Sequence, residues 1–137
     1  MPLDFSPWSQ GAIRLALAVA PQAELILLHA DDVAFEGKLR FAGVAEEVIR
    51  RRRETTRREA LARLQQAAAD AGITAANWRP VVIHGDAASC SLEQEEEQDA
   101  DLIVLGNGVG MTEDFLLGSV TRHVLAQARS DVLVAAR

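Results

Sequence analysis

The stretch DLIVLGNGVG at residues 101–110, followed by LLGSVT at residues 116–121, indicates the architecture of this chain more clearly than any other part. Residues 101–105 have the length and apolar character of a buried strand, and residues 120–128 have a helical pattern. The glycines between them let the backbone approach a ligand, while Gly118-Ser119 offers free N–H groups at the positive end of a helix dipole. This order of strand, glycine loop and helix predicts an anion site, best suited to phosphate.

The alternation of helix and strand extends through the rest of the chain. Further strands are predicted at residues 23–30, 78–84 and 131–135, and further helices at residues 7–20, 44–71 and 87–97. Ser6 is expected to cap the first helix, and residues 31–43 show no clear period and are predicted as a loop. The pattern predicts an α/β fold of three layers, an open parallel sheet with helices on both faces. Ligands of such sheets bind at the carboxyl ends of strands, where the glycine loop lies.

Length and composition indicate an ordinary globular protein. The 137 residues fit one domain spanning residues 1–137, with an apolar fraction of 49%. The net charge of −6 argues against a general nucleic-acid partner. The single cysteine fits a reducing compartment, and no apolar run reaches membrane-span length, so a cytoplasmic protein without a membrane partner is expected.

Six segments together resemble the universal stress protein family over nearly the whole chain. They are DFS at 4–6, LLHA at 27–30, GD at 85–86, ADLIV at 100–104 with LLGSVT at 116–121, and DVLV at 131–134. The resemblance implies an adenine-nucleotide α-hydrolase-like fold whose five-stranded parallel sheet has strand order 3-2-1-4-5. It also implies a homodimer through the last strand, and the apolar edge of residues 131–135 favours such pairing.

Members of this family that bind ATP carry a glycine, two residues, a second glycine, nine residues, and then Gly-Ser or Gly-Thr. In this chain nine residues separate Gly108 from Gly118, and Ser119 follows. Carried over by position, the resemblance places the adenine and ribose at Asp4 and the backbone near Ala30, with Mg²⁺ or Mn²⁺ bridging the phosphates. It places the phosphates against Gly106, Gly108, Gly118, Ser119 and Val120.

Two features depart from the family pattern. Only Asn107 separates Gly106 from Gly108, so the glycine loop is one residue shorter. The central first strand is reduced to Met1-Pro2-Leu3, and three residues span about 10 Å at full extension. The first strand is therefore expected to be very short or missing. There are three alternatives. The first strand is very short, another segment takes its place, or the natural protein has further residues ahead of Met1.

Several polar residues have a structural interpretation beside a functional one. Asp4 can hold a ribose hydroxyl or cap the first helix. The arginines at 50–53 ring their helix, and glutamates four residues earlier favour a solvated, ion-paired helix over a nucleic-acid patch. His29 and His84 both end strands and could approach the same rim, where hydrogen bonding is commoner than metal binding. No metal ligand is assigned.

The first functional hypothesis is a stress-response regulatory protein that binds ATP at the glycine loop and acts as a homodimer. No general base is positioned, so no catalytic residue is assigned and at most slow ATP hydrolysis is expected. The alternative is a universal stress protein that binds no nucleotide and acts as a protein–protein interaction module. A third hypothesis, a hydrolase of phosphate esters or anhydrides, requires a base or metal near Ser119 that the sequence does not show.

Overall fold

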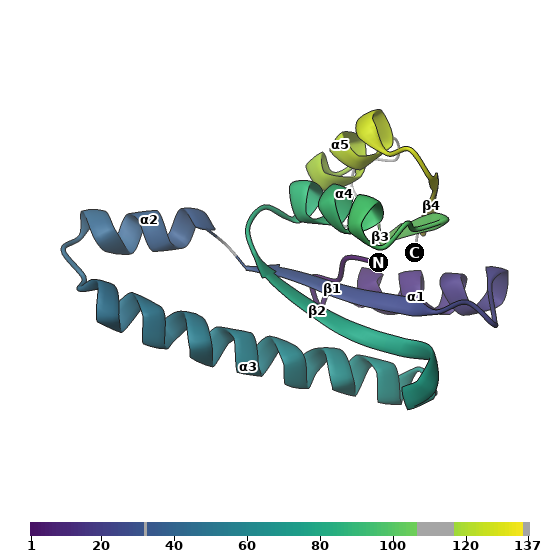
Figure 1. The fold of residues 1–137 in the computed structure, drawn as a ribbon, viewed down its shortest axis with the longest axis horizontal. Helices are drawn as coiled ribbons and strands as arrows, with labels where there is room; N and C mark the ends of the chain where they lie inside the picture. The colour runs from purple at the N-terminus through teal and green to yellow at the C-terminus, as the bar shows by residue number, and fades with distance from the viewer. Residues whose placement is uncertain (32, 107–116, 136–137) are drawn as a thin grey trace.

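Parallel strands alternate with helices in the computed structural model, which describes residues 1–31, 33–106 and 117–135 (Figure 1). The strands are β1 (Leu25–Asp31), β2 (Trp78–His84), β3 (Leu102–Gly106) and β4 (Asp131–Ala135). The helices are α1 (Pro7–Val19), α2 (Val33–Phe41), α3 (Glu46–Asp70), α4 (Ala87–Glu97) and α5 (Ser119–Gln127), with a 3₁₀ turn η1 (Ala75–Asn77). The predicted α/β class is confirmed.

Helix α2 corrects the expectation of a loop over residues 31–43. β1 runs on to Asp31, and nine residues of α2 follow. The sequence VAFEGKLRF has no regular apolar stripe that a periodicity argument could detect. Its inward side chain is instead Glu36, which is 3% exposed and forms ion pairs with α3 and β2. Among the described side chains of α2, the buried one is thus charged and ion-paired, which is why an apolar pattern missed the helix.

The start of α1 also differs in detail from the expectation. The helix begins at Pro7 and Ser6 occupies the N-cap position, but the Ser6 side chain makes no capping hydrogen bond. The Ser6 N–H instead donates to Asp4 Oδ1 at 2.9 Å. The polar side chain that organises this helix start is therefore Asp4.

The strands form two parallel pairs. β1 pairs with β2 over the full length of both strands, and β3 pairs with β4 in the same way. On the other edge of β1, a single parallel bridge joins Pro2 to Leu28, where Leu3 N–H donates to Leu28 O at 2.7 Å and Leu28 N–H donates to Met1 O at 2.9 Å. The first strand is therefore very short. No pairing of this segment with β3 occurs in the described residues, so the full order 3-2-1-4-5 stays a prediction.

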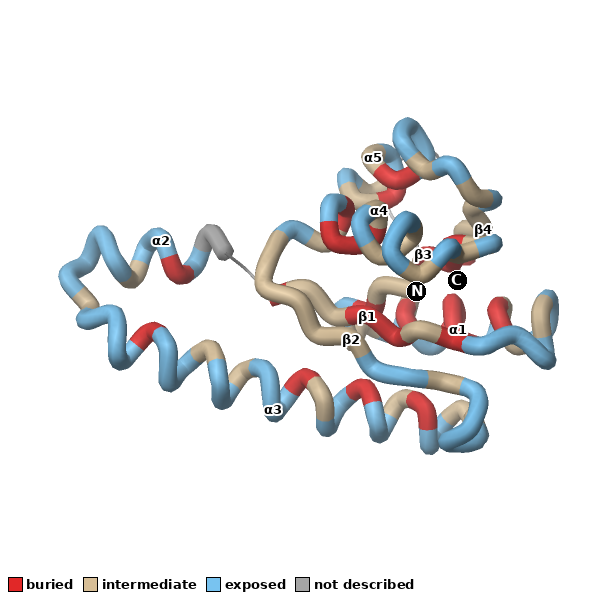
Figure 2. Tube along the Cα trace, viewed as in Figure 1, coloured by how far each residue is buried: buried red, intermediate tan, exposed pale blue. Residues whose placement is uncertain are grey.

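Helices lie on both sides of the strands, and the buried residues of β1 and β3 lie where helices cover them (Figure 2). On one face Leu27 of β1 packs in a cluster with Ile13 of α1 and Leu64 of α3. On the other face Leu105 of β3 packs with Val124 of α5. Burying each of these side chains stabilises the fold by about 1.5–3 kcal/mol. The strand ends are thereby held in place to carry a site.

Helix α3 has a narrow buried stripe on an otherwise solvated surface (Figure 2). Ala60, Leu64 and Ala68 recur every fourth residue and are buried. Arg51, in the arginine run, donates to Glu47 at 2.9 Å, as the ion-paired interpretation expected. Among the described helices, including this long one, none combines the length and the apolar character needed to cross a membrane.

Candidate functional site

A cavity of about 250 Å³ opens at the carboxyl ends of β1 and β3, and we call it the rim pocket. It is lined by Pro2, Leu3, Asp4, Trp8, Ser9, His29, Ala30, Ala87, Leu105, Gly106, Gly118, Ser119, Val120 and Thr121. The lining includes six predicted site residues: Asp4, Ala30, Gly106, Gly118, Ser119 and Val120. The seventh, Gly108, lies outside the described residues. The structure thus brings the six together, and their contact with a ligand stays a prediction.

Asp4 is held by its neighbours on one carboxylate oxygen and leaves the other open. Asp4 Oδ1 accepts hydrogen bonds from the Ser6 N–H at 2.9 Å and from the Ser9 hydroxyl at 2.8 Å. Burial works against the charge, but these hydrogen bonds outweigh it and hold the pKa of Asp4 below its ordinary value. Within the described residues Oδ2 has no hydrogen-bond partner. An ionised acceptor therefore stands at the pocket, ready for a hydroxyl or amino donor.

The start of α5 lies in the same pocket. Gly118 occupies the N-cap position and, having no side chain, makes no capping hydrogen bond to the first helical N–H groups. Ser119 is exposed, and it lines the pocket together with Val120 and Thr121. Free N–H groups and the positive end of the helix dipole attract anions at such a position. The pocket therefore offers an anion-binding end opposite the Asp4 carboxylate.

Gly106, the last residue of β3, is constrained by packing. A β-carbon at this position would lie 2.8 Å from the backbone oxygen of Trp8. Real β-carbons do not approach backbone oxygens so closely, so the end of β3 rests directly on the first turn of α1. Gly106 thus has a structural role as well as its predicted contact with phosphate.

Sequence reasoning missed several residues of the lining. Trp8, Ser9 and Thr121 all contribute, and Ser9 fixes the Asp4 carboxylate. The position of Ser9 in the first turn of α1 could have signalled its role, because the hydroxyl of a serine there can donate a hydrogen bond to a carboxylate that precedes the helix. The contribution of Thr121, by contrast, depends on how α5 packs across β3, which local sequence does not reveal.

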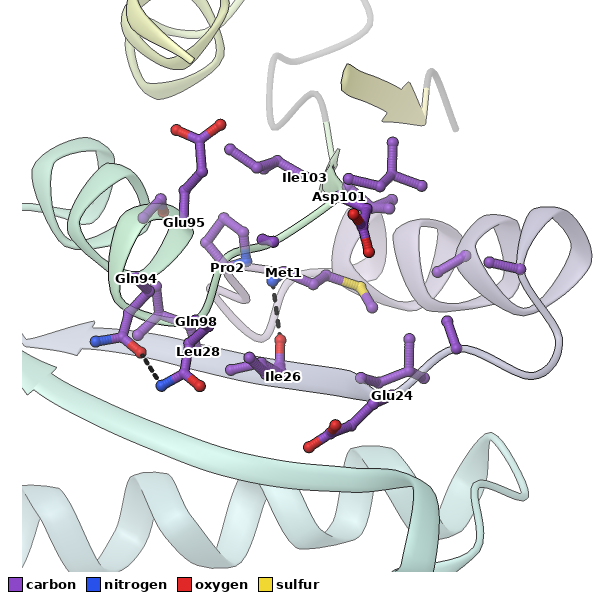
Figure 3. Close-up of a pocket in the computed structure, with 18 of the residues that line it drawn as sticks. Met1, Pro2, Glu24, Ile26, Leu28, Gln94, Glu95, Gln98, Asp101 and Ile103 are labelled. Carbon is purple, nitrogen blue, oxygen red and sulfur yellow. Dashed lines mark hydrogen bonds between the residues drawn. The ribbon is translucent and has the colours of Figure 1, made fainter. Parts of the chain in front are cut away.

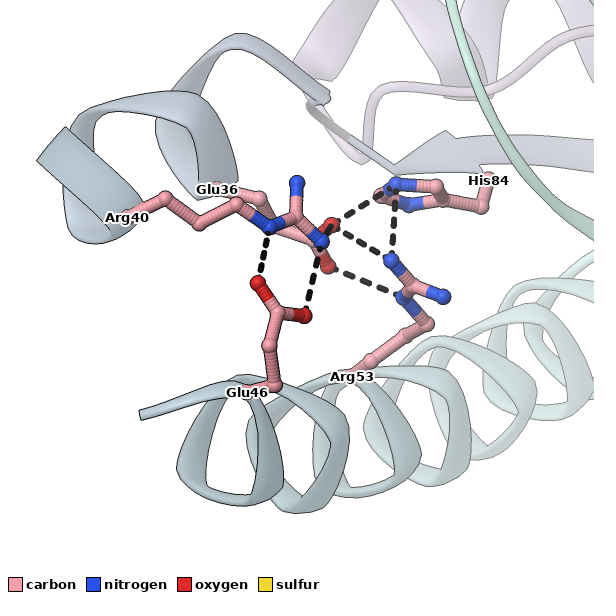
Figure 4. Close-up of polar contacts among 5 residues, drawn as sticks. All are labelled: Glu36, Arg40, Glu46, Arg53 and His84. Carbon is pink, nitrogen blue, oxygen red and sulfur yellow. Dashed lines mark hydrogen bonds and ion pairs between the residues drawn. The ribbon is translucent and has the colours of Figure 1, made fainter. Parts of the chain in front are cut away.

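A second polar group, the Glu36 cluster, consists of Glu36, Arg40, Glu46, Arg53 and His84 (Figure 4). Arg53 donates to the two Glu36 oxygens at 3.0 and 2.6 Å, and His84 Nε2 lies 2.9 Å from Glu36 Oε2. The hydrogen bond from Arg53, opposed by burial, holds the pKa of Glu36 below its ordinary value. The cluster joins α2, α3 and β2, and none of its members lines the rim pocket.

The two strand-end histidines, expected to approach one rim, have different surroundings. His29 lines the rim pocket, and its Nδ1 lies 2.9 Å from the Leu3 carbonyl. His84 belongs to the Glu36 cluster. No group of three metal-ligating side chains occurs in the described parts of the chain.

A larger cavity of about 410 Å³ lies at the opposite, amino ends of β1 and β3 (Figure 3). The amino group of Met1 donates to Ile26 O at 2.8 Å, and burial lowers its pKa to about 5. The Gln98 amide donates to the Gln94 side-chain carbonyl at 3.2 Å, and Glu97 and Arg79 engage the other ends of these two amides. Ligands of open parallel sheets bind at the carboxyl ends of strands, and this cavity includes no helix N-terminus. The rim pocket is therefore the better candidate site.

Comparison with known proteins agrees with this architecture. A family model described as the universal stress protein family matches residues 1–136. The solved structure of hypothetical protein MJ0577 is 25% identical, with a TM-score of 0.79 over 99% of this chain and 92% of that one. A universal stress protein in complex with cAMP is also 25% identical, with a TM-score of 0.61 over 98% and 91%. UspA from Lactobacillus plantarum is 23% identical, with a TM-score of 0.61 over 98% and 93%. No curated protein matched.

Proposed function

Because this chain belongs to the universal stress protein family, we propose that it binds an adenine nucleotide, ATP above all, in the rim pocket. The observation that carries the proposal is the meeting of Asp4, the end of β3 and the start of α5 around one cavity. These segments are far apart in the sequence, and each supplies a group suited to a different part of a nucleotide.

The free oxygen of Asp4 suits the ribose. An ionised carboxylate accepts hydrogen bonds from hydroxyl groups, and Oδ1 of Asp4 is already engaged by Ser6 and Ser9. The start of α5 suits the phosphates, because Ser119 and the N–H groups after Gly118 face the same cavity. The backbone at Ala30 completes the adenine side. A nucleotide carries a sugar with hydroxyl donors, which suits the carboxylate, and an anionic phosphate, which suits the helix start. This pairing supports a nucleotide over an uncharged ligand.

The solved relatives support the same class of ligand. One of the neighbours at 25% identity was solved in complex with cAMP. That complex concerns the neighbour, but it shows that a similar fold accommodates an adenine nucleotide. The described residues contain no three-ligand metal cluster, so Mg²⁺ or Mn²⁺ would arrive bound to the phosphates. We therefore propose binding as the function of a cytoplasmic stress-response regulator, with hydrolysis slow at most.

Isothermal titration calorimetry with ATP and Mg²⁺ tests the proposal. Saturable binding by the natural chain, clearly weakened in Asp4→Ala, is the expected result. GTP serves as the comparison nucleotide, and weaker binding of GTP is expected. No heat at millimolar ATP would overturn the proposal.

The alternative function is a protein–protein interaction module without nucleotide. The short spacing between Gly106 and Gly108 favours it, as does Phe41 at the end of α2, which is 97% exposed. Inserting one residue between these glycines discriminates the two functions. ATP binding by the lengthened chain alone would identify the natural protein as an interaction module.

We also propose that the protein is a two-fold homodimer through β4. Val132, Leu133 and Val134 are apolar, and β4 pairs with β3 on one edge only in the described residues. An apolar edge strand invites pairing with its copy. Light scattering at micromolar concentration is expected to give twice the chain mass, and a monomer there would remove this claim.

A further inference from the structure

Phe5, the residue directly after Asp4, has an unusual backbone conformation. Its φ is +63°, in the left-handed region that residues with a β-carbon rarely occupy. Such conformations persist only where surrounding contacts outweigh their cost, and they concentrate at binding sites. The contacts that hold Phe5 therefore bear directly on the carboxylate beside it.

The Phe5 ring contacts two side chains from distant parts of the chain. Its centroid lies 4.6 Å from that of the His29 ring on β1, with 30° between the two planes. The Arg63 guanidinium on α3 lies 4.2 Å from the Phe5 centroid, a cation–π distance. His29 is itself fixed, because its Nδ1 donates to the Leu3 carbonyl at 2.9 Å. We call Arg63, Phe5 and His29 the rim stack.

The rim stack reaches the pocket wall only through His29. Asp4 and His29 line the rim pocket, whereas Phe5 and Arg63 do not. The left-handed turn at Phe5 lets Asp4 Oδ1 receive the Ser6 N–H, which leaves Oδ2 open. Phe5 and Arg63 therefore contact or adjoin two residues of the pocket, Asp4 and His29, without lining it themselves.

Helix α3 is firmly connected to this stack. Leu64, the neighbour of Arg63, is fully buried and belongs to the same core cluster as Leu3, and Phe5 packs against that cluster. A shift of α3 would change the contact between the Arg63 guanidinium and the Phe5 ring. Through that ring the shift would reach the turn that holds Asp4.

We propose that Phe5 and Arg63 are positioning residues, which hold Asp4 and His29 in binding geometry and couple the nucleotide affinity of the rim pocket to the position of α3. The inference rests on the proposed nucleotide function. It assigns α3, which does not line the pocket, a regulatory role in that function.

The experiment compares four variants: Phe5→Leu, Phe5→Tyr, Arg63→Met and the control Arg57→Met. Phe5→Leu removes the ring and keeps an apolar side chain, while Phe5→Tyr keeps the ring. Arg57 is exposed on the same helix and makes no aromatic contact in the described structure, so it controls for the loss of one positive charge. The readouts are the ATP dissociation constant by calorimetry and the pKa of the Asp4 carboxyl by NMR titration without nucleotide.

Phe5→Leu is expected to weaken ATP binding about tenfold, a coupling of ordinary size between linked sites. It is also expected to move the pKa of Asp4 back toward its ordinary value. Arg63→Met is expected to weaken binding about threefold, the scale of one partly exposed cation–π contact. Phe5→Tyr and Arg57→Met should match the natural protein in both readouts.

Two results would overturn the inference. Unchanged affinity and unchanged pKa of Asp4 in both Phe5→Leu and Arg63→Met would show that the stack positions nothing. A lower melting temperature with those two readouts unchanged would show a purely structural role. The titration of Asp4 needs no nucleotide, so an unchanged pKa refutes the positioning role even if the natural chain proves not to bind ATP. Arg63 is exposed, and Arg63→Met removes its charge and its contact with the Phe5 ring without opening the core, so a folded test protein is expected even if Phe5→Leu fails to fold.

Discussion

The rim pocket and the Glu36 cluster each contain a carboxylate whose pKa lies below its ordinary value, yet the two carboxylates are held in opposite ways. Asp4 is exposed, accepts from a backbone N–H and a serine hydroxyl, and keeps one oxygen open. Glu36 is 3% exposed, and both of its oxygens are engaged by Arg53, with His84 beside one of them. Asp4 therefore keeps a free acceptor oxygen, whereas both oxygens of Glu36 are occupied.

The difference separates a carboxylate with free hydrogen-bond capacity from one without it. Neutral donors stabilise the charge of Asp4 without cancelling it, so a ligand still meets a negative oxygen with free acceptor capacity. Around Glu36 the guanidinium groups of Arg53 and Arg40 neutralise the charge, and the Arg53 contact fixes α2 against α3. A lowered pKa alone therefore does not identify a functional carboxylate, whereas its remaining hydrogen-bond capacity does.

Among substitutions at the two carboxylates, the largest expected effect is that of Asp4 on ligand affinity. Asp4→Ala should weaken ATP binding about thirtyfold, or about 2 kcal/mol, the contribution of a hydrogen bond to a charged group. Asp4→Asn is the matched control, because it keeps an acceptor for Ser6 and Ser9 but loses the charge, and it should bind with intermediate affinity. Calorimetry on the three proteins measures this. Equal affinities would place Asp4 outside the ligand contacts.

The next effect is on stability rather than binding. Glu36→Gln should lower the free energy of unfolding by about 1.5 kcal/mol, because Arg53 and His84 lose a charged partner in a buried position. Urea denaturation measures the change, and ATP affinity should stay as in the natural protein. A loss of affinity without a loss of stability would reverse the roles assigned to the two carboxylates.

A smaller effect is expected in acid. The pKa of folded Glu36 lies below its ordinary value of 4.5, so its contribution to stability is present above that pH and disappears as pH falls through the folded pKa. The natural protein should therefore lose stability more steeply than Glu36→Gln below about pH 5. Unfolding midpoints measured between neutral and acidic pH test this, and parallel curves for the two proteins would contradict it.

The smallest effect is expected at an exposed pair of α3. Arg51 Nη2 lies 2.9 Å from Glu47 Oε1, and both side chains are largely in solvent. Glu47→Gln should leave the melting temperature unchanged within error, since exposed ion pairs contribute little. A drop as large as that of Glu36→Gln would mean that burial does not distinguish the two ion pairs.

The two regions also differ in how far the sequence could predict them. Six residues predicted for one site do lie together in the rim pocket, because glycines after a strand and a Gly-Ser before a helix are local signals. The short first strand followed from the three residues available for it. The Glu36 cluster was not foreseen, because Glu36 and Arg53 are 17 residues apart on helices whose contact the apolar pattern does not reveal. Asn107 and Gly108 lie outside the described residues, so the effect of the short glycine spacing on phosphate binding stays a prediction.

The contact between Gly106 and the Trp8 backbone affects how this glycine would be retained in evolution. A residue that serves both the pocket and the packing of β3 on α1 is kept by two independent selections, and losing one leaves the other in force. A lineage that abandoned the ligand would still need this glycine for packing, and it would still use Asp4 as the acceptor for Ser6 and Ser9. Among descendants of a common ancestor, retention of either residue therefore records that the protein still folds, and only the open oxygen of Asp4 bears on the proposed ligand.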